Sequence, residues 1–209
     1  MTERPFIARG FRGRRSESAE GHRLPPGQHE TKDFPVISAG PTPRTPLDRW
    51  DFTIRNPDGR SARWSWDAFQ ALPHETPTVD IHCVTKWSKF GTRWEGVSVD
   101  TLLEAAASQG VGSAPYLLAF CDGGYTTNLP VADVTGGKAW VAFGYDGAAL
   151  PPEHGGPARL LVPHLYLWKS AKWVRGLRFL PDDSPGFWEQ LGYHNRGDPW
   201  REQRYHGDP

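Results

Sequence analysis

Cysteine is scarce in this chain of 209 residues, which holds only Cys83 and Cys121. Two cysteines do not make a disulfide scaffold, so we expect two free thiols and a cytoplasmic location. Long apolar runs are also missing, because no stretch reaches the roughly 18 residues that a membrane-spanning helix needs. The basic N-terminus contains Arg14 and Arg15, but no apolar segment follows them, so it is not typical of an export signal.

Net charge is absent as well, because 24 Lys and Arg residues balance 24 Asp and Glu residues. No field of the whole molecule attracts nucleic acid, and neither nucleic acid nor a membrane is expected as a partner. The chain is instead rich in Gly, Pro and Trp, with 23, 20 and 10 residues. So many helix-breaking residues exclude an all-helical bundle. The apolar content of 37%, to which glycine adds, still allows a sizeable core.

Composition divides the chain into three parts. Residues 1–33 are polar, basic and rich in turn formers, which predicts an extended N-terminal arm. Residues 34–180 carry most of the apolar segments and would form one domain. Residues 181–209 are again rich in Pro, Gly and Asp, which predicts a tail packed on that domain. Three aromatic residues of the tail are candidate anchors: Trp188, Tyr193 and Trp200.

Short strands separated by turns are predicted for the middle part. The segments with strand character are 50–55, 61–64, 78–84, 116–121, 139–143, 159–162 and 173–180. One amphipathic helix is expected over 99–109, with Ser98 as its N-cap and Gly110 just past its end. A shorter helix would begin after Ser65 and end before Pro73. Together these elements predict a β-rich α+β domain with long loops, where functional residues are commonly found.

Cys83 is the first candidate for chemistry. It follows a strand, and His82, Lys86 and Lys89 lie close to it in the sequence, which would favour the thiolate. A buried core cysteine is the simpler interpretation of this position. That interpretation is stronger still for Cys121, at the end of an apolar strand.

Several motifs of well-characterised sites are missing. The eight histidines show no HxxxH or HExxH spacing and the cysteines no CxxC, so a zinc site has little support. No GxSxG segment marks a serine hydrolase, and the paired glycines lack the spacing of nucleotide-binding loops.

The segment from Pro151 to Val174 combines groups that suit an anion. It contains a turn rich in Pro and Gly with His154, then Arg159, and later the run Lys169-Ser170-Ala171-Lys172. Arginine can hold a phosphate through two hydrogen bonds, lysine adds a point charge, and small residues let the backbone approach. Solvated lysines on an amphipathic turn would give the same pattern, and without other support this simpler interpretation is favoured.

Two segments, taken in order, resemble a known family. The first is 83–88 (CVTKWS), followed by 94–97 (WEGV). The second is 147–173, which includes LPP, GGP, RL, VP and KSAK. They are similar to the cysteine segment and the cofactor-binding segment of the sulfite oxidase-fold molybdenum enzymes. The similarity is greatest to the bacterial branch that includes the methionine sulfoxide reductase catalytic subunit, and it covers residues 34–180.

This resemblance implies an α+β, β-rich sulfite oxidase-type molybdopterin-binding fold in a single domain, without haem or dimerisation domains. It implies an enzyme, a molybdopterin-dependent oxidoreductase with molybdenum and molybdopterin as cofactors. The reaction would move an oxygen atom to or from a small sulfur- or nitrogen-containing substrate. Electrons would pass to a separate carrier or partner protein, and the chain is expected to be a monomer. Val84-Thr85-Lys86-Trp87 replaces the arginine-rich run of sulfite oxidases, so sulfite itself is not implied.

The resemblance also assigns roles residue by residue. Cys83 would be the thiolate ligand of molybdenum and so the catalytic residue. Residues implied to contact the pterin are His154, Ser38 and Ala39. Residues implied to bind its phosphate are Arg159, Ser170, Ala171 and Lys172, with Lys169 in the same basic cluster. Asp122 stands at a further contact position, where that branch usually has threonine.

Two alternatives remain open. The ten Trp residues would suit a non-enzymatic β domain that binds a sugar or a peptide. Cys83 with a distant histidine would suit an enzyme with a cysteine nucleophile. Visible charge-transfer absorption, which a molybdenum–thiolate site gives and a sugar-binding module does not, separates the main interpretation from the first of these.

Overall fold

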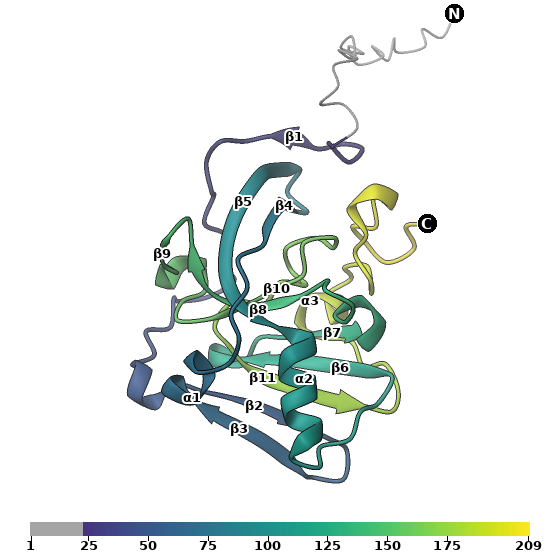
Figure 1. Cartoon of the computed structure of the whole chain (residues 1–209). Coiled ribbons are helices and arrows are strands. Elements are labelled where there is room, and N and C mark those ends of the chain that lie inside the picture. Colours follow the sequence, from purple (N-terminus) through teal and green to yellow (C-terminus); the bar gives the residue numbers. More distant parts are fainter. Residues whose placement is uncertain (1–22) are drawn as a thin grey trace, which may run out of the picture.

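Two β-sheets form the body of the protein (Figure 1). The computed structural model describes residues 23–209, so the first 22 residues of the predicted arm lie outside the described part. Within that part there are three α-helices: α1 (Trp66–Gln70), α2 (Val99–Ser108) and α3 (Phe187–Gln190). Short 3-10 segments occupy Leu47–Arg49, Asp122–Gly124, Val131–Asp133, Pro152–His154 and Pro199–Arg201. None of these helices is long and apolar enough to cross a membrane.

One sheet has five strands in the order β3-β2-β11-β6-β7. Its strands are β2 (Asp51–Arg55), β3 (Ser61–Ser65), β6 (Tyr116–Cys121), β7 (Thr126–Pro130) and β11 (Val174–Leu180). β11 is central, pairing in parallel with β2 and antiparallel with β6. Gly176 allows this packing, because a Cβ there would overlap the Thr53 carbonyl oxygen and lie 2.5 Å from the Phe120 ring.

The other sheet has six strands, with β1, β5, β8 and β10 in sequence across it, β4 paired to β5 and β9 to β8. Its strands are β1 (His29–Glu30), β4 (Thr78–His82), β5 (Trp87–Ser98), β8 (Trp140–Tyr145), β9 (Ala148–Ala149) and β10 (Arg159–Leu161). β1 lies in parallel beside the start of β5, with His29 opposite Trp87. A short piece of the region before residue 34 is thus part of this sheet.

The predicted helix after Ser98 is confirmed, and both of its ends follow from local sequence. The Ser98 side chain accepts a hydrogen bond from the Thr101 N–H at the start of α2. At the end, Gly110 has φ = 82°. The N–H of Val111 then donates to Ala106 at 3.1 Å, which satisfies a carbonyl oxygen of the last turn.

A strand is found in each of the seven predicted segments, whereas β5, β7 and the two-residue strands β1 and β9 were not predicted. β5 is the longest strand, yet Gly91, Gly96 and several polar residues break its apolar pattern. It forms because it pairs with β1, β4 and β8, contacts that local sequence does not reveal.

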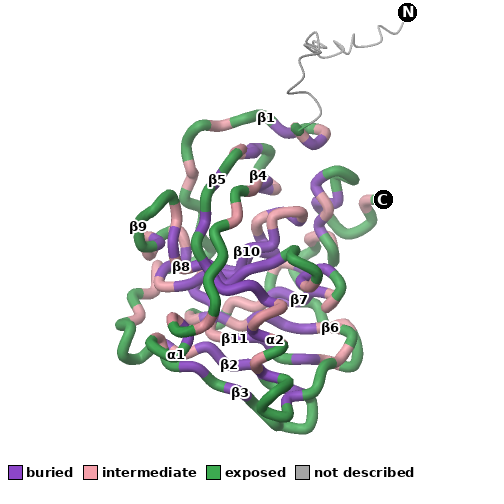
Figure 2. The backbone as a smooth tube through the Cα atoms, in the orientation of Figure 1, coloured by how far each residue is buried: buried purple, intermediate pink, exposed green. Residues whose placement is uncertain are grey.

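The buried residues lie mainly where the two sheets and α2 meet (Figure 2). The main apolar cluster joins residues of both sheets and α2, among them Phe52, Leu102, Val141 and Leu177. A smaller cluster lies around the start of β5 and includes Cys83 and Trp87. Cys83 is therefore one of the buried residues of this smaller cluster.

Candidate functional site

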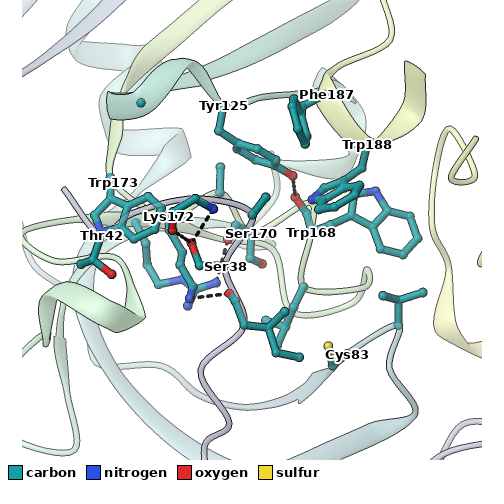
Figure 3. A pocket seen from close by; sticks show the side chains of 18 of the residues that line it. Ser38, Thr42, Cys83, Tyr125, Trp168, Ser170, Lys172, Trp173, Phe187 and Trp188 are labelled. Carbon is teal, nitrogen blue, oxygen red and sulfur yellow. Dashed lines mark hydrogen bonds between the residues drawn. The ribbon is translucent and has the colours of Figure 1, made fainter. Parts of the chain in front are cut away.

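A cavity of about 510 Å³ opens between loops that follow strands of both sheets (Figure 3). Its walls come from 34–43, the turn after β4, the loop after β6, the loop between β10 and β11, and the segment around α3. Eight of the predicted site residues line it: Ser38, Ala39, Cys83, Asp122, Arg159, Ser170, Ala171 and Lys172. Its volume is within the range of pockets that bury cofactors or drug-sized molecules.

Cys83 begins the turn that joins β4 to β5. Its N–H donates to the Trp87 carbonyl at 2.8 Å, and the Lys86 N–H donates to the Cys83 carbonyl at 3.1 Å. Lys86 closes the turn with φ = 74°. The Thr85 hydroxyl donates to the Cys83 Sγ at 3.1 Å. Cys83 is only 7% exposed, and Figure 3 shows its sulfur at the cavity.

Buried polar groups support this turn from behind. Gln28 donates through Nε2 to the Cys83 carbonyl at 3.1 Å, and Arg204 donates to the Val84 carbonyl at 2.6 Å. His82 shares a 2.8 Å hydrogen bond with Ser88, and burial lowers the pKa of His82 to about 4. Both ends of the described chain thus hold the cysteine turn in place.

Arg159 is a buried cation whose partners are all neutral. It is 2% exposed, and its guanidinium donates to the carbonyls of His154 at 2.9 Å and Ser170 at 2.7 Å. Burial lowers its pKa to about 10. Within residues 23–209, no carboxylate forms an ion pair with it. An unpaired buried charge is costly, so this guanidinium suits an anion bound in the cavity.

Lys172 is the second cation of the cavity. Its ammonium donates to the carbonyls of Ile37 at 2.9 Å and Glu153 at 2.7 Å. Burial, followed by the charge of Arg159, lowers the pKa of Lys172 to about 8. The positive charges of Arg159 and Lys172 repel each other, so an anion bound near both would favour their charged forms.

Small residues bring backbone donors beside these cations. The N–H groups of Ala171 and Lys172 donate to no group in the described part of the chain. The Ser170 hydroxyl accepts from the Val162 N–H at 2.8 Å, which leaves its own hydrogen free to donate. Gly155, at φ = 110°, permits the close packing, because a Cβ there would lie 3.0 Å from Cα of Lys172. Cations and free N–H groups together suit a phosphate.

Two predicted contact residues have more specialised positions. His154 does not line the cavity; its ring stacks on Phe34, which does, with centroids 3.9 Å apart. No group among the described residues bonds to the buried Nδ1 of His154. Asp122 lines the cavity, but its carboxylate accepts from Arg175 at 3.0 Å and from Thr45 at 2.6 Å. Arg175 therefore balances the charge of Asp122.

Lys169 does not belong to the basic cluster, contrary to expectation. Its ammonium lies 2.6 Å from Glu189 in an ion pair in which both side chains are buried. It also donates to the Asn128 carbonyl at 2.8 Å. The cluster expected from the sequence is therefore reduced to Arg159 and Lys172.

One side of the cavity was not expected from the sequence. Five rings form what we call the aromatic wall: Tyr125, Trp168, Phe187, Trp188 and Tyr193. Trp188 and Tyr193 were expected only to anchor the tail. The high number of aromatic residues in the Pro- and Gly-rich tail was the one sequence feature that pointed to this wall. The sequence does not show which surface of the domain these rings cover.

The chemistry of the lining fits a sulfur-bound metal cofactor. Among the described lining residues, Cys83 alone offers a sulfur ligand, which suits a metal already held by the sulfurs of a pterin. Across residues 23–209, no three His, Cys, Asp or Glu side chains gather into a metal site. Cys121 is also a free thiol, but it packs in the main core, and burial raises its pKa.

A cysteine nucleophile finds less support in this geometry. A general base must lie within hydrogen-bond reach of the thiol it activates. In the described part of the chain, the side-chain partner of the Cys83 sulfur is Thr85, and His82 bonds to Ser88 instead.

Comparison with known proteins agrees with the chemistry of the cavity. The model of the family described as oxidoreductase molybdopterin binding domain matches residues 39–188. Uncharacterized oxidoreductase YuiH of Bacillus subtilis is 39% identical over 197 residues, which cover 94% of this chain and 98% of that protein.

More distant relatives share part of their length with this chain. Putative protein-methionine-sulfoxide reductase subunit YedZ1 of Azospira oryzae is 30% identical over 63% of this chain and 49% of its own. Sulfite oxidase of Gallus gallus is 32% identical over 48% of this chain and 24% of its own. The chain therefore spans half or less of these two relatives.

A solved structure shows the same fold. The sulfane dehydrogenase SoxCD from Paracoccus pantotrophus superposes with a TM-score of 0.58 at 21% identity, over 68% of this chain and 41% of that one. These findings do not favour a non-enzymatic Trp-rich module. The protein is an enzyme of the sulfite oxidase-fold oxidoreductases with a molybdopterin binding domain, a family whose cofactor is molybdenum held by molybdopterin.

Proposed function

We propose that this oxidoreductase is an oxygen-atom transferase in which Cys83 supplies the thiolate ligand of molybdenum. One observation carries the proposal: the Cys83 thiol lines the same cavity as the Arg159 guanidinium, which has no carboxylate partner among residues 23–209. A thiolate and an anion site at one cavity match a metal bound through an anionic pterin. When bound, the cofactor supplies the two-electron chemistry of oxygen transfer.

The chain's own residues would bind and orient the cofactor. Arg159 and Lys172, with the hydroxyl of Ser170 and the N–H groups of Ala171 and Lys172, would hold its phosphate. Residues that would cover the pterin are Ser38 and Ala39 from the 34–43 segment, and His154 acting through Phe34. Asp122 would act through Arg175. The guanidinium of Arg175 balances the negative charge of the Asp122 carboxylate, which lines the same cavity as the proposed phosphate site.

Thr85 would tune the sulfur ligand. Its hydroxyl donates to the Cys83 Sγ and so draws electron density from the sulfur. Hydrogen bonds of this kind to ligating atoms set the properties of a metal site.

The proposal extends to organisation and partners. Residues 34–180 would hold the cofactor, and the 181–209 tail would complete the cavity through Phe187, Trp188 and Tyr193. The substrate would be a small sulfur- or nitrogen-containing molecule, and a separate carrier would exchange electrons with the site. The cytoplasmic location and the monomeric state stay predictions, which cell fractionation and light scattering would test.

The test is metal and pterin analysis of protein made in a host that synthesises molybdopterin. The wild type should contain stoichiometric molybdenum and pterin and show a visible thiolate charge-transfer band. Cys83→Ser should lose that band and the redox activity, even where pterin contacts retain the cofactor. Arg159→Met should lose the pterin.

Cys121→Ala is the matched control, because Cys121 is buried but does not line the cavity. It should keep cofactor, band and activity. Native protein without molybdenum would contradict the proposed function, and an unchanged band in Cys83→Ser would contradict the role of Cys83.

A further inference from the structure

Two segments from opposite ends of the described chain meet behind the Cys83 turn. Residues 23–33, which we call the arm segment, bring β1 beside the start of β5 (Figure 1). Residues 193–209, which we call the terminal loop, fold back so that Tyr193 bridges to Tyr205. Apart from Tyr193, these described residues do not line the cavity, so they act on the sulfur through the groups that they contact.

Gln28 of the arm segment brings a buried amide to the turn. It is 9% exposed, and its Nε2 donates to the Cys83 carbonyl at 3.1 Å. Its Oε1 accepts from the Ser88 hydroxyl at 3.4 Å, and Ser88 is bonded to His82 at 2.8 Å. The amide is therefore oriented from behind, and it bonds to the backbone of the residue that carries the sulfur.

Arg204 of the terminal loop brings a buried positive charge to the same turn. It is 8% exposed, and its guanidinium donates to the Val84 carbonyl at 2.6 Å and lies 5.0 Å from the centre of the Tyr166 ring. Its ion-pair partner within the described chain is the half-exposed Glu202, at 3.9 Å. Because a buried charge is screened little by solvent and this partner is distant, the field of Arg204 extends to the turn.

The arm segment and the terminal loop also fit closely against each other. Gly27 has φ = 69°, a conformation that favours glycine. A Cβ at this position would lie 2.6 Å from Oε1 of Glu202 and 3.3 Å from Nη2 of Arg204. A larger residue at position 27 would therefore displace the side chains that the terminal loop presents to the arm segment.

We propose that Gln28 and Arg204 are positioning residues of the reaction, which fix the direction of the Cys83 sulfur and set the reduction potential of the metal bound to it. The inference rests on the proposed role of Cys83 as the metal ligand. Groups that bond to a ligating residue control its orientation and its electron density. Rotation of the Cys83–Val84 backbone would break one of the two bonds. The charge of Arg204 disfavours the more positive, oxidised metal and so raises the potential.

The first test is redox titration of the molybdenum-loaded enzyme, followed by electron paramagnetic resonance. Arg204→Met removes the charge, so the reduction potential should fall and the thiolate charge-transfer band should shift. Arg204→Lys keeps the charge and should restore most of the potential. If Arg204→Met does not fold, Arg204→Gln takes its place, since it removes the charge and keeps a donor. Arg201→Met is the matched control, because Arg201 is an exposed cation of the same loop that makes no bond to the turn among the described residues.

The second test measures the position of the turn without the metal. In a Cys121→Ala background Cys83 is the sole thiol, and its rate of alkylation by iodoacetamide at fixed pH reports its exposure. Gln28→Met keeps the length of the side chain and removes the donor, so alkylation should be about 10-fold faster, the equivalent of one buried hydrogen bond. Gln109→Met is the matched control, because Gln109 donates to the Ala105 carbonyl at 3.2 Å on the surface.

Each result bears on a definite claim. If Arg204→Met has the potential and the band of Arg201→Met, the role of Arg204 is wrong. If Gln28→Met is alkylated as slowly as Gln109→Met, the role of Gln28 is wrong. In both cases the proposed function stands, because Cys83→Ser tests it separately. Protein without molybdenum contradicts the proposed function and, with it, the effect of Arg204 on the metal.

Discussion

The hydroxyl of Thr85 donates a hydrogen bond to the sulfur of Cys83 across 3.1 Å. Both residues belong to the turn between β4 and β5, whose shape depends on the positive φ of Lys86. Because the turn is also held from behind by Gln28 and Arg204, the sulfur and its donor have one fixed geometry. The electron density on the proposed ligand is therefore set by a neighbour two residues away.

Thr85→Val keeps the shape of the side chain and removes the donor. With more electron density on the sulfur, the oxidised metal is better stabilised, so we expect a lower reduction potential and a shifted charge-transfer band. Activity should change by about 10-fold, as is typical when a group that bonds to a ligand is lost. Redox titration followed by electron paramagnetic resonance measures the potential. Thr85→Ser retains the hydroxyl and should resemble the wild type; equal potentials in both variants would refute the role.

The buried ion pair of Lys169 and Glu189 predicts a stability effect. Lys169→Met leaves the Glu189 carboxylate buried without its cation, which should cost about 3–5 kcal/mol of unfolding free energy. Urea denaturation measures this loss. In the double variant Lys169→Met/Glu189→Gln the uncompensated charge is gone, and the remaining amide oxygen can still accept from Trp168, so the loss should be smaller. A double variant as unstable as the single one would contradict this account.

The depressed pKa of Lys172 predicts a pH dependence of the cofactor-free protein. The pKa is about 8 in the folded state and 10.5 for an ordinary lysine, so between these values the unfolded chain binds more protons. Unfolding free energy should therefore rise with pH over this window relative to Lys172→Met. Equilibrium denaturation at a series of pH values measures the difference.

Binding of an anion beside Lys172 should raise the pKa of Lys172. The rise of the unfolding free energy with pH should then become smaller. The same comparison on cofactor-loaded protein is the control. A pH dependence that is unchanged by loading would argue against Lys172 as a phosphate contact.

The central strand predicts a test of the fold that is independent of the site. Gly176→Ala should lower the unfolding free energy by about 1–3 kcal/mol, because its Cβ meets the Thr53 carbonyl and the Phe120 ring within the five-stranded sheet. At Gly112 the nearest heavy atom to an added Cβ is Nδ2 of Asn56 at an ordinary 3.8 Å, so Gly112→Ala should change stability by less than about 0.5 kcal/mol. Thermal denaturation compares the two; equal effects would contradict the register of β11.

Local features of the sequence determined much of the fold. The ends of α2 follow from Ser98 and Gly110, which act on groups within a few residues of them. Most strands follow from alternating or apolar runs, and the cysteine and cofactor segments are recognisable as linear motifs. The family and its cofactor were therefore evident from the sequence, because motifs keep their order and spacing along the chain.

Tertiary structure alone decided which residues meet. Lys169 and Lys172 are three positions apart, yet one is buried against Glu189 and the other lines the cavity. The aromatic wall unites Tyr125, Trp168 and residues of the tail, and β5 exists because three other strands pair with it. The physical reason is the same in each case: burial and pairing energies depend on partners that are distant in sequence, so the local pattern carries no record of them.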